Sequence, residues 1–427
     1  MVSIEKSFEE LTVYYNDVLN KDKTTYVSSN DEPTPIECIT EMINKIPDDL
    51  WNTPDLKILD PCCGNGNFMI NLFFKLKEKG LTNKKILNDI FHFNDINKSR
   101  LDNVKVVFDN SNYDLNITNQ DFLEFPETNK YHLIVANPPY AKISPDGKRA
   151  SKNHNLIKLF LDKAINLLKP GGYLLFITPD NWMSYSDRNL LISKITKLQI
   201  IHLDIHTAKK YFKKIGSSFT WYVIQNKPAY KDISVRSLWK NKIYDSIIPN
   251  MEKKYIPLLY TKEVQSILSK TIENEKYQKY NIQTSSDLHK YTKRDIIQTE
   301  QTADYPFKLI HTPKQTVYSN RPHKFQGGYK VFIPTTDKYI PFVENDCGMT
   351  QSIAFIRCED NSQAEYYKSL LSHDLYKFIN NITRWGNFNN IRILQSFPMP
   401  SKYTQPEGLY DFFEITKEEQ KFIEENL

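Results

Sequence analysis

The chain has 427 residues, 40% of them hydrophobic and 25% charged, and a formal net charge of +5. These values are typical of a globular protein of two or three domains, exclude a wholly disordered chain, and permit a nucleic-acid partner without requiring one. No apolar run approaches the roughly 18 residues that span a bilayer and no signal peptide is visible, so we expect a cytoplasmic protein without membrane contact. The 5 cysteines, two of them adjacent, suit neither a disulfide framework nor a zinc site, and we expect no metal.

Short apolar strands alternate with helical stretches between residues 57 and 226, a pattern typical of βαβ units and a mostly parallel sheet. Apolar residues at helical spacing predict helices over residues 67–79 and 156–168, and the second stops at Pro170-Gly171-Gly172. The predicted strands cover residues 57–59, 105–108, 133–136, 173–178, 200–205 and 219–225.

After Lys227-Pro228 this alternation weakens, which predicts a domain boundary. The segment from residue 230 to 286 resembles a polar helical region, short β-like runs follow at 331–334 and 352–357, and helical spacing returns over 365–379. We therefore expect an α/β domain over residues 1–228, followed by a mixed α+β domain over residues 229–427.

Residues 57–68 read KILDPCCGNGNF, an apolar strand that ends at Asp60, a loop that contains Gly64 and Gly66, and then a helix. Glycines let a backbone turn tightly and approach a ligand, and a helix N-terminus offers free N–H groups. Asp60 would repel a pyrophosphate, so the loop favours a cationic, amine-bearing ligand such as S-adenosylmethionine over a dinucleotide. A plain strand–turn–helix junction is the alternative.

Acidic residues also follow the next two strand ends. Asp95, which comes directly after the strand-like residues 91–94, is preferred over Asp89 as the residue that binds ribose hydroxyls. Ile96 would then pack on an adenine ring, and Asp121 would accept a hydrogen bond from the adenine amine. Each acid could instead be a helix cap or a turn residue.

The strand at residues 133–136 leads into Asn137-Pro138-Pro139-Tyr140. Two prolines stiffen this loop and lack N–H groups, so its carbonyls stay free to accept. The Asn137 amide and the Pro138 carbonyl would accept both hydrogens of an exocyclic amine, while Tyr140 would stack on the attached ring. This arrangement would direct the nitrogen lone pair toward a methyl donor by positioning and electrostatics alone. The alternative is a proline-rich turn.

Together these motifs resemble the amino-methylating DNA methyltransferases of the γ arrangement, which modify the N6 amine of adenine. The resemblance covers roughly residues 30–228, and its matching segments are Thr34-Pro35-Ile36, DPCCGNGNF at 60–68, Asp95-Ile96, Asp121-Phe122, NPPY at 137–140 and residues 159–179. It implies a Rossmann-like seven-stranded domain that binds S-adenosylmethionine and takes up a base flipped out of double-stranded DNA, followed by a target-recognition domain.

The resemblance also implies roles for individual residues. Thr34 and Pro35 would close over the methionine end of the cofactor, and Phe212 would stack on the flipped base opposite Tyr140, with Tyr211 as the next candidate. The cofactor-binding set that it implies is Thr34, Pro35, Asp60, Cys62, Gly64, Gly66, Asp95, Ile96, Asp121 and Phe122. The catalytic set is Asn137, Pro138, Pro139 and Tyr140. The polar side chains of the second half that suit DNA are Arg384, Asn387, Asn389 and Arg392.

We therefore predict a site-specific DNA adenine-N6 methyltransferase, the monomeric modification enzyme of a restriction–modification system, with a separate cognate endonuclease as an expected partner. The same pocket would serve adenine N6 in RNA, cytosine N4 in DNA or a glutamine amide in a protein, and the long segment after Pro228 favours DNA. The sequence shows no convincing nuclease motif, which argues against a fused nuclease. An inactive DNA-binding subunit is opposed by the intact Asp60, Asp95 and NPPY residues.

Overall fold

The computed structural model describes residues 3–22, 32–126, 130–140, 155–187, 190–212, 218–386 and 388–427. The chain divides into two compact units. The first consists of Met1–Asp180, Leu190–Ser237 and Asp245–Lys253, and the second of Asn181–Asn189, Leu238–Tyr244 and Lys254–Leu427. This division does not coincide with the predicted boundary after residue 228. Among the described residues, no helix is long and apolar enough to cross a membrane.

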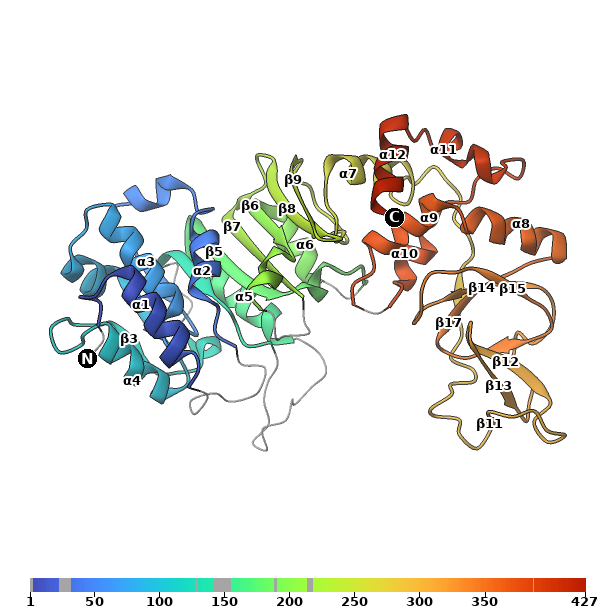
Figure 1. The fold of residues 1–427 in the computed structure, drawn as a ribbon, viewed down its shortest axis with the longest axis horizontal. Coiled ribbons are helices and arrows are strands. Elements are labelled where there is room, and N and C mark those ends of the chain that lie inside the picture. The colour runs from blue at the N-terminus through green and yellow to red at the C-terminus, as the bar shows by residue number, and fades with distance from the viewer. Residues whose placement is uncertain are drawn as a thin grey trace. The chain divides into compact units, whose positions relative to one another are not determined.

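A single sheet is the centre of the first unit. Its strands are β1 (Ile58–Asp60), β2 (Phe91–Asn94), β3 (Ile117–Thr118), β4 (Tyr131–Ala136), β5 (Leu168–Pro179), β6 (Leu198–Ile205), β7 (Phe219–Pro228), β8 (Ile233–Trp239) and β9 (Lys242–Ile248). Within the described chain their spatial order is β3-β2-β1-β4-β5-β7-β6-β8-β9. Figure 1 labels the part of this order from β5 through β7, β6 and β8 to β9. The strands β1 to β5 pair in parallel, whereas β7 runs antiparallel to β5 and β6. The expected Rossmann-like seven-stranded sheet is confirmed, and β8 and β9 extend it.

Helices cover this sheet because its central strands are apolar on both faces. Every residue of β1 and β2 is buried, as is usual for parallel strands. The helices of the first unit are α1 (Phe8–Tyr14), α2 (Ile36–Ile43), α3 (Asn67–Glu78), α4 (Lys98–Val107), α5 (Asn155–Leu167) and α6 (Leu190–Lys197). Helix α1 lies against α3, where the ring centroids of Phe8 and Phe74 are 5.2 Å apart (Figure 1).

The strand predicted at residues 105–108 is wrong, because these residues lie at the end of helix α4. Leu101, Val104 and Val107 are buried at three-residue spacing, and the Asn97 side chain caps the helix by accepting from the Ser99 N–H group. A short run of β-branched residues read alone cannot be distinguished from the buried stripe of a helix.

The helical region predicted at residues 230–286 is also mostly wrong. The strands β8 and β9 occupy its first part, and its only described α-helix is α7 (Lys262–Lys270). Side chains alternate between buried and partly exposed along most of β8, which is the period of a strand with one face on the core. These two strands are the reason why the first sheet continues beyond residue 228.

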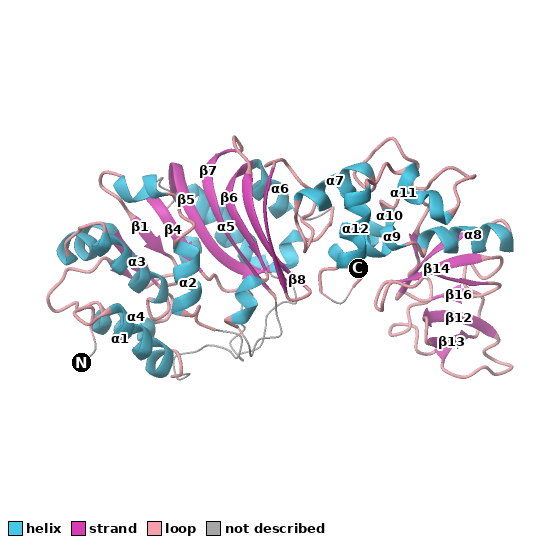
Figure 2. Cartoon of the chain, turned by 45° about the horizontal axis from the view of Figure 1, so that its top comes forward, coloured by secondary structure: helices cyan, strands magenta, loops and turns pink. Residues whose placement is uncertain are grey.

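The second unit is a mixed α+β unit, as predicted (Figure 2). Its described strands form two four-stranded sheets with the orders β10-β17-β14-β15 and β11-β13-β12-β16. The strands are β10 (Gln283–Thr284), β11 (Ile297–Gln298), β12 (Phe307–Thr312), β13 (Gln315–Ser319), β14 (Lys330–Pro334), β15 (Phe342–Glu344), β16 (Gly348–Met349) and β17 (Ile353–Arg357). Its other helices are α8 (Asn361–Leu371), α9 (Asp374–Ile382), α10 (Ile391–Gln395), α11 (Leu409–Phe412) and α12 (Lys417–Asn426). The helix predicted over 365–379 is thus two helices, since His373 caps the start of α9.

Gly66 is expected to be the glycine on which the loop between β1 and α3 depends most. Its φ is +89°, and a Cβ atom there would lie 2.8 Å from Phe108 Cε2. Gly66→Ala should lower the free energy of unfolding by about 3 kcal/mol, from left-handed strain and overpacking together. Gly64→Ala is the matched control, because Gly64 has a φ of +55° but no atom within 4 Å of such a Cβ. Urea unfolding measures both, and an equal loss in the two variants would contradict this assignment.

Candidate functional site

The glycine loop is held at the carboxyl edge of the sheet by its neighbours. The Cys63 N–H group donates to the Asn94 carbonyl at 2.8 Å, and the Tyr15 hydroxyl donates to the Asn65 carbonyl at 2.8 Å. Tyr15 is fully buried and directly follows α1, so this part of the chain packs against the loop and holds it in place. Gly64 instead borders open space. The loop therefore combines a fixed backbone with one accessible surface.

Two buried carboxyl groups flank this loop. The Asp60 side chain is 1% exposed and accepts from the Cys62 N–H group at 3.2 Å. Burial raises the pKa of the Asp60 carboxyl well above its usual range, the Cys62 N–H group opposes that shift, and the nearby Asp95 adds to it. The Asp95 carboxylate accepts from the N–H groups of Gly64 and Asn97, each at 2.8 Å. Two acids so close together favour a ligand that carries positive charge and hydroxyl donors.

Asn94 is a residue that the sequence reasoning missed. Its amide donates to the carbonyls of Pro61 at 2.8 Å and Gln120 at 3.1 Å, and its oxygen accepts from the Thr118 hydroxyl at 2.8 Å. One fully buried side chain thus joins the ends of β1, β2 and β3. The available signal was an amide side chain at the last position of the strand-like residues 91–94, directly before Asp95.

The third predicted acid has a local structural task. The Asp121 carboxylate accepts from the Leu123 N–H group at 2.9 Å and caps a short 3-10 helix. Phe122, by contrast, is 2% exposed, and its ring packs against Phe125 and Phe160 in the core. The Phe122 ring is thus part of the core, and the cofactor-binding role that the resemblance implies for this residue stays a prediction.

The NPPY loop lies beside the glycine loop, since the Cys62 thiol is 3.6 Å from the Asn137 carbonyl oxygen. The Asn137 amide nitrogen donates to the Glu32 carbonyl at 3.2 Å and to the Thr34 hydroxyl oxygen at 3.1 Å. The Asn137 amide oxygen accepts from the Tyr140 hydroxyl. The side chain is therefore held by partners on both ends of its amide, with the oxygen end toward a hydrogen-bond donor.

An aromatic cluster adjoins this loop. The Tyr140 ring centroid is 6.1 Å from that of Phe219, and the Phe219 centroid is 4.5 Å from that of Phe212. Phe212 is 3% exposed, and its ring packs on that of Phe219. It therefore belongs to the aromatic cluster beside Tyr140, but as a buried member. Phe219, the first residue of β7, carried no sequence signal beyond its apolar character. Tyr211 donates its hydroxyl to Glu41 at 2.7 Å.

The residues of the second unit that were predicted to suit DNA differ from one another in exposure and in bonding partners. Asn389 is 2% exposed and donates to the carbonyls of Pro334 and Asp337, so its amide is a structural tie. Arg392 is half-exposed and forms an ion pair with Asp187. Asn387 lies outside the described residues, as do residues 213–217 after Phe212.

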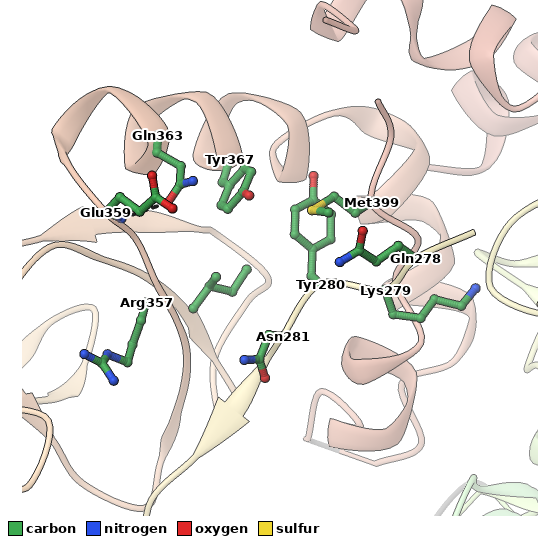
Figure 3. Close-up of a pocket in the computed structure, with 10 residues that line it drawn as sticks. Gln278, Lys279, Tyr280, Asn281, Arg357, Glu359, Gln363, Tyr367 and Met399 are labelled. Carbon is green, nitrogen blue, oxygen red and sulfur yellow. Dashed lines mark hydrogen bonds between the residues drawn. The ribbon is translucent and has the colours of Figure 1, made fainter. Parts of the chain in front are cut away.

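One cavity of the second unit has a volume of about 230 Å³ (Figure 3). Arg357, Glu359 and Gln363 line one side, and Tyr280 and Asn281 lie opposite them (Figure 3). Its walls therefore mix a guanidinium, a carboxylate and amides. None of the predicted catalytic or cofactor-binding residues is part of this cavity.

Comparison with known proteins agrees with the features of the first unit. Residues 57–212 match the model of the Eco57I restriction-modification methylase family. The modification methylase CviBIII of Paramecium bursaria Chlorella virus NC1A is 23% identical over 408 residues, which cover 92% of this chain and 99% of the relative. The type II methyltransferase M.VspI of Vibrio sp. (strain 343) is 26% identical over 182 residues, 40% of this chain and 42% of the relative.

Two solved structures share the fold along most of the chain. A nuclease-deletion mutant of the type ISP restriction-modification enzyme LlaGI, in complex with a DNA substrate mimic, has a TM-score of 0.55 at 13% identity over 98% of this chain. The DrdV–DNA complex has a TM-score of 0.53 at 12% identity over 90% of this chain. The present chain spans 56% and 58% of those two chains.

These matches support a methyltransferase of the restriction–modification type, for which the methyl donor is S-adenosyl-L-methionine. The residues around the glycine loop fit that cofactor. Gly64 borders open space, the Asp60 carboxyl and the Asp95 carboxylate suit its amino group and ribose hydroxyls, and Ile96 is 71% exposed directly beside Asp95. An exposed apolar side chain at this position suits the face of an adenine ring.

Asp95 is expected to control cofactor affinity. Asp95→Ala removes an acceptor of two loop N–H groups and, in our assignment, of ribose hydroxyls, so the Kd for S-adenosylmethionine should rise by roughly 10- to 100-fold. Asp89→Ala is the matched control, since Asp89 is half-exposed and pairs only with Lys85 among the ion pairs of the described residues. Isothermal titration measures both affinities, and thermal melting checks that each variant is folded. Unchanged affinity in folded Asp95→Ala would refute the role.

Proposed function

We propose that the protein is a site-specific DNA methyltransferase that transfers a methyl group from S-adenosylmethionine to the N6 amine of an adenine flipped out of double-stranded DNA. The observation that carries this proposal is the hydrogen bonding of Asn137. Its amide nitrogen is bound by two acceptors, and its amide oxygen is directed at a donor, the Tyr140 hydroxyl. That oxygen is therefore aligned to accept from an N–H group at the carboxyl edge of the sheet.

In the proposed reaction the target amine takes the place of the Tyr140 hydroxyl at the Asn137 oxygen. The Pro138 carbonyl accepts the second hydrogen of the amine, on a loop that its two prolines stiffen. With both hydrogens bound, the nitrogen lone pair leaves conjugation with the ring and becomes nucleophilic. When bound, the cofactor would supply a methyl group on a sulfonium, and the nitrogen–methyl bond would form as the sulfur–methyl bond breaks to leave a neutral thioether. The methylated nitrogen would then lose one of its two protons to water from its position at the Asn137 and Pro138 oxygens, so the protein contributes alignment rather than a base or a metal.

Aromatic side chains would hold the flipped base in this position. Tyr140 remains the proposed stacking residue on one side of the base. Among the described residues, the Tyr140 ring contacts that of Phe219, and Phe212 packs on Phe219 in turn. We therefore propose that Phe212 supports the stacking surface through Phe219, rather than meeting the base alone.

The remaining parts of the proposal concern DNA and partners. Residues 229–427 would supply most of the target recognition, by base-edge and phosphate contacts. The likeness to LlaGI, which was solved with a DNA substrate mimic, supports DNA as the substrate, because that likeness extends over 98% of this chain. The protein would act as a monomer and protect sites that a separate cognate endonuclease cleaves.

Replacement of Asn137 should separate chemistry from cofactor binding. Asn137→Ala removes the acceptor for the amine, so turnover should fall by at least about 100-fold, as it does when one preorganised hydrogen-bonding group is lost from an active site. The affinity for S-adenosylmethionine should stay within about twofold of the wild type, because Asn137 is not among the proposed cofactor-binding residues. Asn44→Ala, at an exposed position after α2, is the control. Parallel loss of both properties would indicate misfolding.

The proposal as a whole is tested by identifying the methylated base. The protein is incubated with isotopically labelled S-adenosylmethionine and unmethylated genomic DNA, which is then digested to nucleosides. We expect the label on N6-methyladenine. Label on N4-methylcytosine would keep the pocket and overturn the choice of base, and the absence of label from DNA would overturn DNA as the acceptor.

A further inference from the structure

Thr34 is more enclosed than a residue that covers a cofactor would need to be. Its side chain is 3% exposed, its hydroxyl oxygen accepts from the Asn137 amide at 3.1 Å, and its carbonyl accepts from the Asn67 amide at 2.9 Å. The Thr34 hydroxyl and the Thr34 carbonyl are thus both bound by other parts of the protein. We infer that Thr34 is a positioning residue, which holds the Asn137 carboxamide in the orientation that methyl transfer requires.

The orientation of this carboxamide matters because its two ends have nearly the same shape and opposite hydrogen-bonding character. With the oxygen toward the target amine, Asn137 accepts from it; with the nitrogen toward the amine, two donors would face each other. The Glu32 carbonyl can only accept, so it selects the end at which the amide nitrogen lies. The Thr34 hydroxyl binds the same nitrogen and fixes the plane of the amide.

Asn67 connects this arrangement to the glycine loop. It is the first residue of α3, directly after Gly66, and is 5% exposed. Its amide nitrogen donates to the Thr34 carbonyl and, at 3.3 Å, to the Asn20 side chain. A continuous path of hydrogen bonds therefore leads from the start of α3 through Thr34 to Asn137. The position of the catalytic amide then depends on the same helix N-terminus that shapes the proposed cofactor site.

This inference rests on the proposed function and differs from a cofactor contact in what it predicts. A residue that binds cofactor should alter the Kd for S-adenosylmethionine. A residue that positions Asn137 should alter the rate of methyl transfer after both substrates are bound. The two roles are therefore separated by a single-turnover rate at saturating cofactor and DNA, measured beside the cofactor Kd.

The test compares variants that keep or remove the hydroxyl. Thr34→Val preserves the shape of the side chain and should slow single-turnover transfer roughly tenfold, the effect of one hydrogen bond lost from a partly buried amide. Thr34→Ser keeps the hydroxyl and should stay within about twofold of the wild type. The control is Thr40→Val, because the Thr40 hydroxyl donates to the Asn71 side chain on α3 rather than to Asn137. The cofactor Kd should be unchanged in all three variants.

Three results would overturn the inference. In the first, Thr34→Val transfers methyl groups as fast as the wild type and binds cofactor equally well. In the second, Thr34→Val binds cofactor more weakly while the rate at saturation stays unchanged, which would restore the cofactor role. If Thr34→Val does not fold, Thr34→Ala carries the same expectation and the same two refutations. A wild-type protein that methylates no base in DNA would overturn the proposed function and this inference together, whereas an active wild type with a fast Thr34→Val would overturn this inference alone.

Discussion

The parallel pairing of β1 with β4 is the constraint on which the candidate site depends. Ile58 lies opposite Leu133 and Leu59 opposite Ile134, so the two strands end at the same edge of the sheet. The loop after β1 carries Asp60 and the glycines, and the loop after β4 carries Asn137. Because both strands are buried, a shift of register would disrupt the packing of their side chains in the core, and this packing therefore fixes the positions of the two loops relative to each other.

Much of the first unit could be predicted because its signals are local. An apolar strand, glycines at left-handed positions and a following amphipathic helix are all encoded within residues 57–78, and the NPPY sequence specifies a stiff loop without reference to the rest of the chain. The failures at residues 105–108 and 230–286 have a common cause. There the apolar residues alone are compatible with a helix or a strand, and contacts with distant segments decide between them.

The roles of individual site residues were harder to predict for the same reason. Asn94 and Thr34 act through bonds to residues that are distant in sequence, such as Gln120 and Asn137. Phe122 lies in a recognised motif, yet its ring belongs to the core. In the second unit, Asn389 has a side chain suited to a base edge, but its amide nitrogen already donates to two backbone carbonyls. Residue type and motif indicated a chemistry, while burial decided which side chains are available for it.

The buried hydroxyl of Tyr15 has a practical consequence for anyone who shortens this protein. The family match begins at residue 57, which invites a catalytic fragment that starts there. Such a fragment would lack Tyr15, so the Asn65 carbonyl would lose its hydrogen-bond donor and the space next to Gly66 would open to solvent. The smallest piece that preserves the loop must therefore include α1 and the residues that follow it. The residues before the family match therefore help to hold the glycine loop in place.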